Sequence, residues 1–223
     1  MSVDDDRTAA RIVYDRTASD YAAFVGTEIS EGIETAADIE LLDDVIAATP
    51  SGGRLLDLGC GTARVAARAA GAGIDAVGMD LAPAMLTEAR AAHPRVPLAA
   101  GALHQIPASD GSFAAVVLWY SIIATPPDGL GEVWREIGRV GHTSAPFVVA
   151  FQAGDGEADR RDDAYGSGAS FTLYRHSPDQ VAAGLTAAGH DVKRVVVRPA
   201  DTVAHEHTPQ GFVLGRLHDR RMR

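Results

Sequence analysis

A short apolar run that ends in an acidic residue and two glycines limits the possible folds of this chain more than any other feature. Residues 55–64 read LLDLGCGTAR, which is typical of a buried strand, a tight turn and the start of a helix. Gly59 and Gly61 lack a Cβ atom, so the turn can adopt left-handed backbone angles and let a ligand approach the main chain. Two glycines alone also fit an ordinary strand-to-helix turn, so this segment by itself leaves both interpretations open.

The rest of the chain alternates short apolar runs with helical stretches, as parallel strands joined by crossover helices do. Strands are predicted at Arg54–Leu58, Asp75–Asp80, Val96–Ala100, Phe113–Trp119 and Phe147–Gln152, with helices opening near Thr62, Pro83 and Asp128 and a later helix from the N-cap Ser177 to about Ala188. Two further candidates, Val192–Val197 and Gly211–Leu217, leave no room for a crossover helix and should pair antiparallel. The pattern therefore predicts an α/β fold with a mostly parallel sheet and an antiparallel C-terminal strand.

Residues 1–53 are predicted to form an N-terminal helical cap that belongs to the same domain as residues 54–223. Tyr14 and Tyr21 lie seven positions apart and therefore share one face of a helix, which indicates packing onto the domain or closure over a ligand. The segment Gly154–Ser170 is rich in Gly, Asp and Arg and is predicted to be a long loop without regular structure, and a candidate lid.

The charge of the chain argues against two classes of partner. Thirty acidic residues against 20 basic ones give a formal net charge of −10, which repels nucleic acid and anionic membrane surfaces. The longest nearly apolar run, residues 113–124, is too short for a spanning helix, and the aspartate-rich residues 1–7 do not resemble a secretory signal. We expect a cytoplasmic protein with no nucleic-acid or membrane partner, and the oligomeric state stays open.

A second carboxylate raises the significance of the glycine turn. Asp80 ends the next predicted strand, about 20 residues after the turn, where an acidic side chain can accept hydrogen bonds from the two hydroxyls of a ribose. NAD fits poorly, because Asp57 precedes the turn and Arg64 replaces the third glycine of a dinucleotide motif. S-adenosylmethionine has no phosphate, and its ammonium group suits an acidic turn. An NAD-dependent oxidoreductase and a cofactor-binding protein without methyl transfer remain the alternatives.

Residues 54–152 resemble the class I S-adenosylmethionine-dependent methyltransferases. The family's first motif, acidic-x-Gly-x-Gly-x-Gly, corresponds to Asp57-x-Gly59-x-Gly61-x-Ala63, with alanine in place of the last glycine. The Tyr-Asp and Asp-Tyr pairs at residues 14–15 and 20–21, together with the Trp-Tyr-Ser-Ile-Ile run at 119–123, are similar to a bacterial small-molecule subgroup. The resemblance implies a Rossmann-like fold and methyl transfer to an oxygen or nitrogen of a small-molecule acceptor.

The same resemblance implies the residues that hold the cofactor. Asp80 would hold the ribose and Leu81 would flank the adenine, and the glycine turn would surround the methionine part. The full set of expected contacts is Tyr14, Tyr21, Asp57, Gly59, Cys60, Gly61, Thr62, Asp80, Leu81, Met85, Ala102, Leu103, Trp119 and Tyr120. Trp119, Tyr120 and Phe151 are also expected to wall the cleft, which suggests an apolar or aromatic acceptor.

No general base stands out in the sequence. Tyr120, His142, His176 and Asp155 are candidates, although each is also typical of a solvated or capping side chain. Alignment of the acceptor with the methyl group and exclusion of water would supply most of the catalysis. His205 and His207 offer only two ligands of one type, so we predict no metal site.

Overall fold

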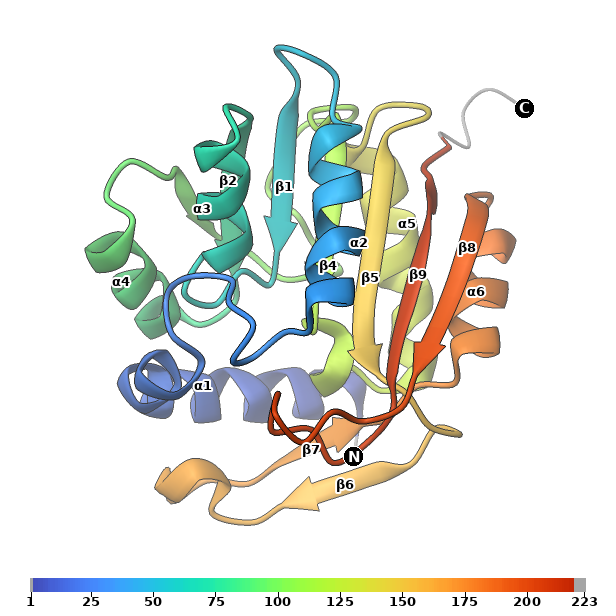
Figure 1. The fold of residues 1–223 in the computed structure, drawn as a ribbon. Helices are drawn as coiled ribbons and strands as arrows, with labels where there is room; N and C mark the ends of the chain where they lie inside the picture. Colours follow the sequence, from blue (N-terminus) through green and yellow to red (C-terminus); the bar gives the residue numbers. More distant parts are fainter. Residues whose placement is uncertain (1, 219–223) are drawn as a thin grey trace.

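The computed structural model describes residues 2–218 and contains a seven-stranded sheet in the order β3-β2-β1-β4-β5-β9-β8 (Figure 1). The strands are β1 Arg54–Leu58, β2 Asp75–Asp80, β3 Leu98–Ala100, β4 Ala115–Trp119, β5 Pro146–Gln152, β8 Asp191–Arg198 and β9 Gln210–Arg216. Strands β1 to β5 pair in parallel, whereas β9 runs antiparallel to both β5 and β8. The predicted α/β, Rossmann-like fold with an antiparallel C-terminal strand is confirmed.

Helices cover both faces of this sheet, because successive side chains of a buried parallel strand point to opposite faces. The helices are α1 Val3–Val25, α2 Ala36–Ala47, α3 Arg64–Gly71, α4 Pro83–Ala92, α5 Leu130–Val140 and α6 Pro178–Ala187. In β4, Ala115 and Val117 share a core cluster with residues of α2, α3 and α4, whereas Val116 and Leu118 share the other cluster with residues of α5 and α6. Helices therefore cover both faces of the sheet around β1, β2, β4 and β5, and the carboxyl edge of these strands is left for a site.

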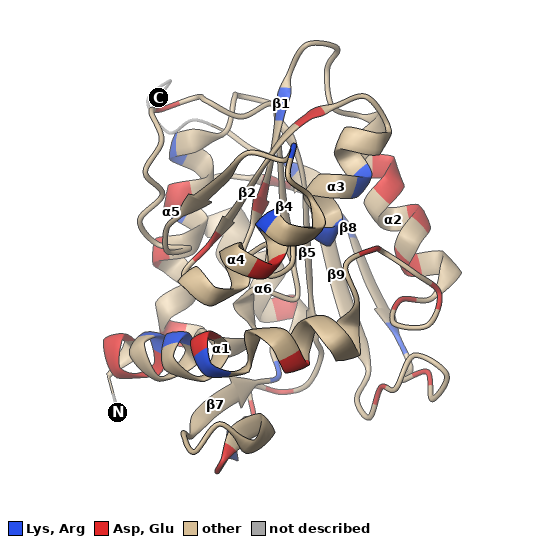
Figure 2. Cartoon of the chain, turned by 90° about the vertical axis from the view of Figure 1, so that its left-hand side faces the viewer, with Lys and Arg blue, Asp and Glu red and all other residues tan. Residues whose placement is uncertain are grey.

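Helix α1 crosses this carboxyl edge instead of covering a face (Figure 1). It begins with a capping box in which Ser2 and Asp5 exchange hydrogen bonds, and its first turn carries Asp4, Asp5 and Asp6, seen in red near the N-terminus in Figure 2. Asp15 accepts a hydrogen bond of 3.0 Å from the backbone of Ala84 and so caps α4. Of the two helices in the predicted N-terminal cap, α1 thus spans the strand ends, whereas α2 packs on a face of the sheet. The boundary between the cap and the rest of the domain, at residue 53, stays a prediction.

The prediction of a loop without regular structure at Gly154–Ser170 is wrong. This segment contains β6, Ala158–Arg161, and the short helix η3, Ala164–Gly166; β6 pairs antiparallel with β7, Phe171–Tyr174. The hairpin lies against α1, because Phe171 and Leu173 pack with Ala10 and Val13. Its first strand reads Ala-Asp-Arg-Arg and is mostly exposed, so it carries no alternation of apolar and polar residues that would have predicted it.

Several element boundaries also differ from those predicted. Helix α3 starts at Arg64 and not near Thr62, because Ala63 has a left-handed φ of 61°. Strand β3 begins at Leu98, after Pro97, which has no amide hydrogen to donate. Strand β4 begins at Ala115, and Phe113 forms only an isolated bridge with Gly141.

Among residues 2–218, none of the helices is both long and apolar enough to cross a lipid bilayer. In the same range, His, Cys, Asp and Glu side chains form no group of three that could hold a metal ion.

Candidate functional site

A cavity of about 870 Å³, including its open mouth, lies at the carboxyl edge of the sheet beneath α1. The strand ends of β1, β2, β3 and β4 form its floor, and α1 contributes one wall. The predicted cofactor contacts that line it are Tyr14, Tyr21, Gly59, Gly61, Asp80, Leu81, Met85, Ala102, Leu103, Trp119 and Tyr120. Residues that are far apart in the sequence therefore meet at the place expected for a ligand of an open α/β sheet.

The glycine turn brings the backbone into the cavity. Gly59 and Gly61 have left-handed φ values of 76° and 52°, and the amides of Gly59 and Cys60 both donate to the carbonyl oxygen of Met79. A Cβ atom on Gly59 would lie only 2.3 Å from the Cβ atom of Ser121. The end of β4 thus packs directly onto this turn, and only glycine fits there.

Substituting Gly59 with alanine is expected to distort the turn. The left-handed backbone alone costs a residue with a Cβ atom about 1–2 kcal/mol, and the contact with Ser121 forces β4 and the turn apart. We expect a lower melting temperature and loss of S-adenosylhomocysteine binding in calorimetry. Gly71→Ala at the end of α3 is the matched control, because a Cβ atom there has no neighbour within 4 Å. Equal behaviour of the two variants would contradict the role given to Gly59.

Asp80 presents its carboxylate to the cavity from the end of β2. Its Oδ2 accepts a hydrogen bond of 2.8 Å from the amide of Gly61, and its Oδ1 accepts one of 2.9 Å from the amide of Ala82. Each oxygen keeps a second acceptor position, so the carboxylate can also receive two hydroxyl groups. Burial raises the pKa of Asp80 above its usual value, while these amide hydrogen bonds lower it. The side chain is held in place before any ligand binds.

Asp57, Cys60 and Thr62 lie behind the cavity wall. Asp57 is buried, and its Oδ2 accepts a hydrogen bond of 3.0 Å from the amide of Ala66 in the first turn of α3. Its Oδ1 finds no partner among the described residues, and burial raises its pKa to about 7, with Asp80 adding to the rise. Thr62 donates to the carbonyl oxygen of Gly26. These side chains support the turn, and their direct contact with a cofactor stays a prediction.

Two tyrosines of α1 face the strand ends. Their rings pack edge to face with centroids 6.0 Å apart, and Tyr21 reaches to 3.6 Å from the position of a Cβ atom on Gly61. Neither hydroxyl has a hydrogen-bond partner among the described residues. Burial raises the pKa of Tyr14 well above its usual value and also raises that of Tyr21. Both phenols therefore stay protonated at neutral pH and can donate a hydrogen bond to a ligand.

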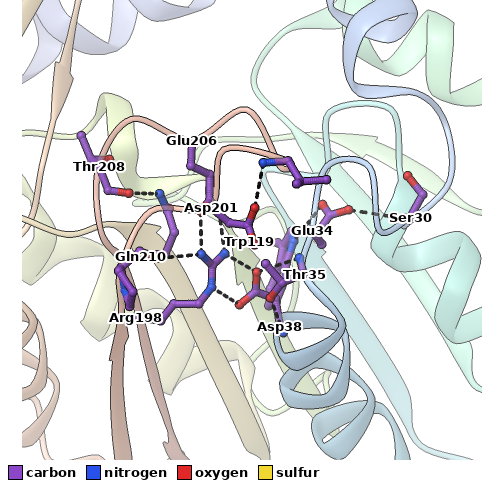
Figure 3. A network of polar contacts seen from close by, with 12 residues as sticks. Ser30, Glu34, Thr35, Asp38, Trp119, Arg198, Asp201, Glu206, Thr208 and Gln210 are labelled. Atoms are coloured by element: carbon purple, nitrogen blue, oxygen red, sulfur yellow. Dashed lines mark hydrogen bonds and ion pairs between the residues drawn. The ribbon is translucent and has the colours of Figure 1, made fainter.

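A network of ion pairs supports the opposite wall (Figure 3). Glu34 binds the guanidinium of Arg64 at 2.7 Å and accepts a hydrogen bond of 3.4 Å from the indole of Trp119. Arg198 binds both Asp38 and Glu206 and also lies over the ring of Phe212, 5.9 Å from its centroid. The network joins residues of α2, α3, β4 and β8 with Glu34 and Glu206 from loops, and no local pattern in the sequence connects these segments.

The candidate bases are not brought together. Tyr120 lines the cavity, and burial raises the pKa of its phenol well above the usual value, which favours the protonated form. The backbone of His142 pairs with Phe113, beyond the far end of β4, and His176 is buried with Nε2 3.1 Å from the carbonyl oxygen of Ile122. Asp155 lies in the loop before β6. Of these candidates, only Tyr120 lines the cavity.

Phe151 does not line the cavity as predicted, and several residues that do line it were not predicted from the sequence. Phe151 is fully buried in the core, because its alternate position in β5 turns it away from the cavity and against Gly211. Arg7 and Arg11 line the cavity together with Tyr14, and this spacing along one helix face could have revealed them. His104 and Ser121 also line it, each directly after a predicted contact residue.

Part of this chain is similar to known proteins. Residues 55–143 match the family described as methyltransferase domain. A demethylmenaquinone methyltransferase from Beutenbergia cavernae is 35% identical over 117 residues, which are 49% of this chain and 48% of that protein. This chain thus matches about half the length of that curated relative.

Solved structures share the fold over almost the whole chain. The [4+2]-cyclase SpnF has a TM-score of 0.71 at 19% identity, covering 94% of this chain and 95% of its own. Magnesium protoporphyrin IX methyltransferase from Synechocystis PCC 6803, solved with bound S-adenosylhomocysteine, has a TM-score of 0.69 at 15% identity, covering 95% and 99%. At these identities the likeness concerns the fold alone.

The strand order and the glycine turn at the end of β1 define a domain of the Rossmann-like class. Within it, residues 55–143 match a methyltransferase domain. The Synechocystis neighbour of the same fold was solved with bound S-adenosylmethionine and with bound S-adenosylhomocysteine.

Proposed function

We propose that this chain transfers the methyl group of S-adenosylmethionine to an oxygen or nitrogen atom of a small-molecule acceptor. The observation that carries the proposal is the preformed carboxylate of Asp80 beside a glycine turn, in a cavity closed on one side by α1. The match of residues 55–143 to the methyltransferase domain family supports it.

The residues of the cavity fit the cofactor in three parts. Asp80 has two free acceptor positions for the ribose hydroxyls, and Leu81 and Leu103 offer apolar surface for the adenine. The turn at Gly59 and Gly61 leaves room for the methionine part, since neither residue has a Cβ atom. The unpaired hydroxyl of Tyr21 lies on the same side, where it can donate to the cofactor carboxylate.

The protein contributes mainly by binding and orientation. When bound, the cofactor supplies a methyl group on a positively charged sulfur, so that the acceptor forms a bond to carbon as the carbon–sulfur bond breaks and its electron pair stays on sulfur. Alignment of the acceptor in a site without bulk water can supply roughly 7–11 kcal/mol of the barrier. The aromatic side chains of Trp119, Tyr120 and Tyr14 line the cavity and favour an apolar or aromatic acceptor.

The test is incubation of the protein with metabolite extracts and S-adenosylmethionine labelled in its methyl group. We expect a labelled small molecule whose yield falls strongly with Asp80→Ala at limiting cofactor concentration, because that variant should bind the cofactor much more weakly. Mass spectrometry of the product identifies the acceptor atom. Tight cofactor binding without any labelled product would instead support a protein that uses the same pocket without methyl transfer. Thermal stabilisation by NADH alone would favour an oxidoreductase.

A further inference from the structure

A buried carboxylate lies behind the aromatic wall of the cavity. Glu34 is only 2% exposed and is not among the residues that line the cavity. Its Oε1 lies 2.7 Å from the guanidinium of Arg64 and accepts a hydrogen bond of 3.4 Å from the indole of Trp119. Its Oε2 accepts one of 3.3 Å from the amide of Ser30, as Figure 3 shows. Partners from three separate segments thus hold this side chain in one position.

Stability alone does not explain the ion pair of Glu34 with Arg64. Arg64 begins α3, three residues after Gly61, and is 9% exposed, so both charges are buried. Burying a carboxylate and a guanidinium costs about as much free energy as their attraction returns, and apolar residues often replace such pairs without loss of stability. The arrangement that the pair imposes on its neighbours is therefore the better explanation, and the neighbour that shares the carboxylate is Trp119.

Trp119 is the residue through which this pair reaches the cavity. It ends β4 and lines the cavity, and its ring packs against Tyr120 and Phe212 with a centroid distance of 5.8 Å to each. The χ2 torsion of tryptophan has two broad minima, so two orientations of the indole compete. Nε1 is the single polar atom of the ring, and within residues 2–218 only Glu34 accepts a hydrogen bond from it. This bond therefore selects the orientation of the indole in the cavity wall.

The same two charges lie beside a second wall of the cavity. Burial raises the pKa of the Tyr21 phenol; Arg64 opposes this rise, and Glu34 adds to it. The ring of Tyr21 in turn covers the glycine turn, 3.6 Å from the position of a Cβ atom on Gly61. The ion pair therefore lies where α1, the glycine turn and the end of β4 meet. This is the part of the cavity that we propose for the methionine part of the cofactor.

We propose that Glu34 is a positioning residue for methyl transfer: anchored by Arg64, its carboxylate fixes the indole of Trp119 in the cavity wall against which the acceptor aligns. This inference rests on the proposed function and adds to it a residue that lies outside the cavity. Because alignment supplies most of the catalysis, a misplacement of about 1 Å can cost on the order of 100-fold in rate. Glu34 should therefore affect the rate of transfer more than the affinity for the cofactor.

Fluorine NMR reports the position of the indole without turnover. The chain has two tryptophans, Trp119 and Trp134, so protein grown with 5-fluorotryptophan gives two fluorine resonances, which Trp119→Phe assigns. Trp134 is buried in the core and serves as the internal reference. Spectra are recorded with and without S-adenosylhomocysteine, and calorimetry measures the dissociation constant of that ligand. The rate of transfer is measured at saturating S-adenosylmethionine with the acceptor that the labelling experiment identifies.

Three variants separate positioning from stability. Glu34→Gln keeps an acceptor oxygen for the indole and should retain both resonances and most of the transfer rate. Glu34→Met removes that acceptor. The double variant Glu34→Met with Arg64→Met also removes the guanidinium, so that no unpaired charge stays buried; if Glu34→Met does not fold, the double variant decides.

Both methionine variants should lose the fixed indole. We expect the Trp119 resonance to shift and broaden, the Trp134 resonance to stay, and the rate of transfer to fall about tenfold to 100-fold. The dissociation constant of S-adenosylhomocysteine should change by less than about threefold, because neither Glu34 nor Arg64 lines the cavity.

Asp43→Met is the matched control. It breaks the ion pair of Asp43 in α2 with Arg68 in α3, at 2.6 Å, and neither of these residues lines the cavity. Both resonances and the transfer rate should stay as in the wild type.

The possible failures are distinct. An unchanged Trp119 resonance in both methionine variants overturns the proposal, as does a shifted resonance with an unchanged rate of transfer, or the same changes in Asp43→Met. A wild type that binds no S-adenosylhomocysteine or labels no acceptor contradicts the proposed function itself, and the Trp119 resonance then still shows whether Glu34 fixes the indole.

Discussion

Replacing Asp80 with alanine is expected to weaken S-adenosylmethionine binding by about 2–4 kcal/mol, roughly 30-fold to 1,000-fold in dissociation constant. The substitution would remove the two charge-assisted hydrogen bonds that we propose between Asp80 and the ribose. It also frees the amides of Gly61 and Ala82, which the carboxylate holds at 2.8 and 2.9 Å. Isothermal calorimetry with S-adenosylmethionine and S-adenosylhomocysteine measures the loss.

Asp80→Asn separates these two contributions. Asparagine has nearly the same shape and keeps one acceptor oxygen, so we expect an affinity between those of the wild type and the alanine variant. Asp75→Ala at the start of the same strand is the control, because that side chain is half exposed and pairs only with Arg54. An unchanged affinity in Asp80→Ala, with normal folding by circular dichroism, would contradict the placement of the ribose.

The second large effect concerns Asp57 and the stability of the protein without cofactor. Burial raises the pKa of its carboxyl to about 7 in the folded state, against about 4 in the unfolded chain. The folded state therefore favours the protonated form of Asp57. The contribution of this carboxyl group to the stability of the folded protein is fully present below about pH 4 and is lost as the pH rises through about 7. Asp57→Asn removes this titration while keeping an acceptor for the amide of Ala66.

We expect Asp57→Asn to gain stability relative to the wild type as the pH rises. The difference in unfolding free energy between the two proteins should shift in favour of the variant by about 2–3 kcal/mol between pH 5 and pH 8. Urea denaturation at both pH values measures it, and comparison with the wild type cancels the titration of the other groups. A difference that stays constant between pH 5 and pH 8 would show that Asp57 is ionised normally in the folded protein.

Elements with a strong local signal could be predicted from the sequence. The buried strands β1, β2, β4 and β5 consist largely of apolar residues, and the capping residue Ser177 begins α6 as expected. The site was predictable for a related reason. A glycine turn after one strand and Asp80 at the end of the next are local features, and parallel pairing of β1 with β2 brings them together.

Features that depend on tertiary packing could not be predicted in this way. Strand β6 is charged and exposed, and it forms only because β7 packs against α1. The sequence predicts Phe151 in the cavity wall, but the alternation of side chains in β5 directs it into the core. The contact of Arg198 with Asp38 joins residues 160 positions apart, and no pattern in either segment predicts it.

A crystal structure of the protein soaked with S-adenosylhomocysteine tests the central claim most directly. We expect the ribose hydroxyls within hydrogen-bond distance of Asp80, the adenine between Leu81 and Leu103, and the sulfur atom near Gly59 and Ser121. An empty cavity at saturating ligand, or the nucleoside bound elsewhere, would contradict the account.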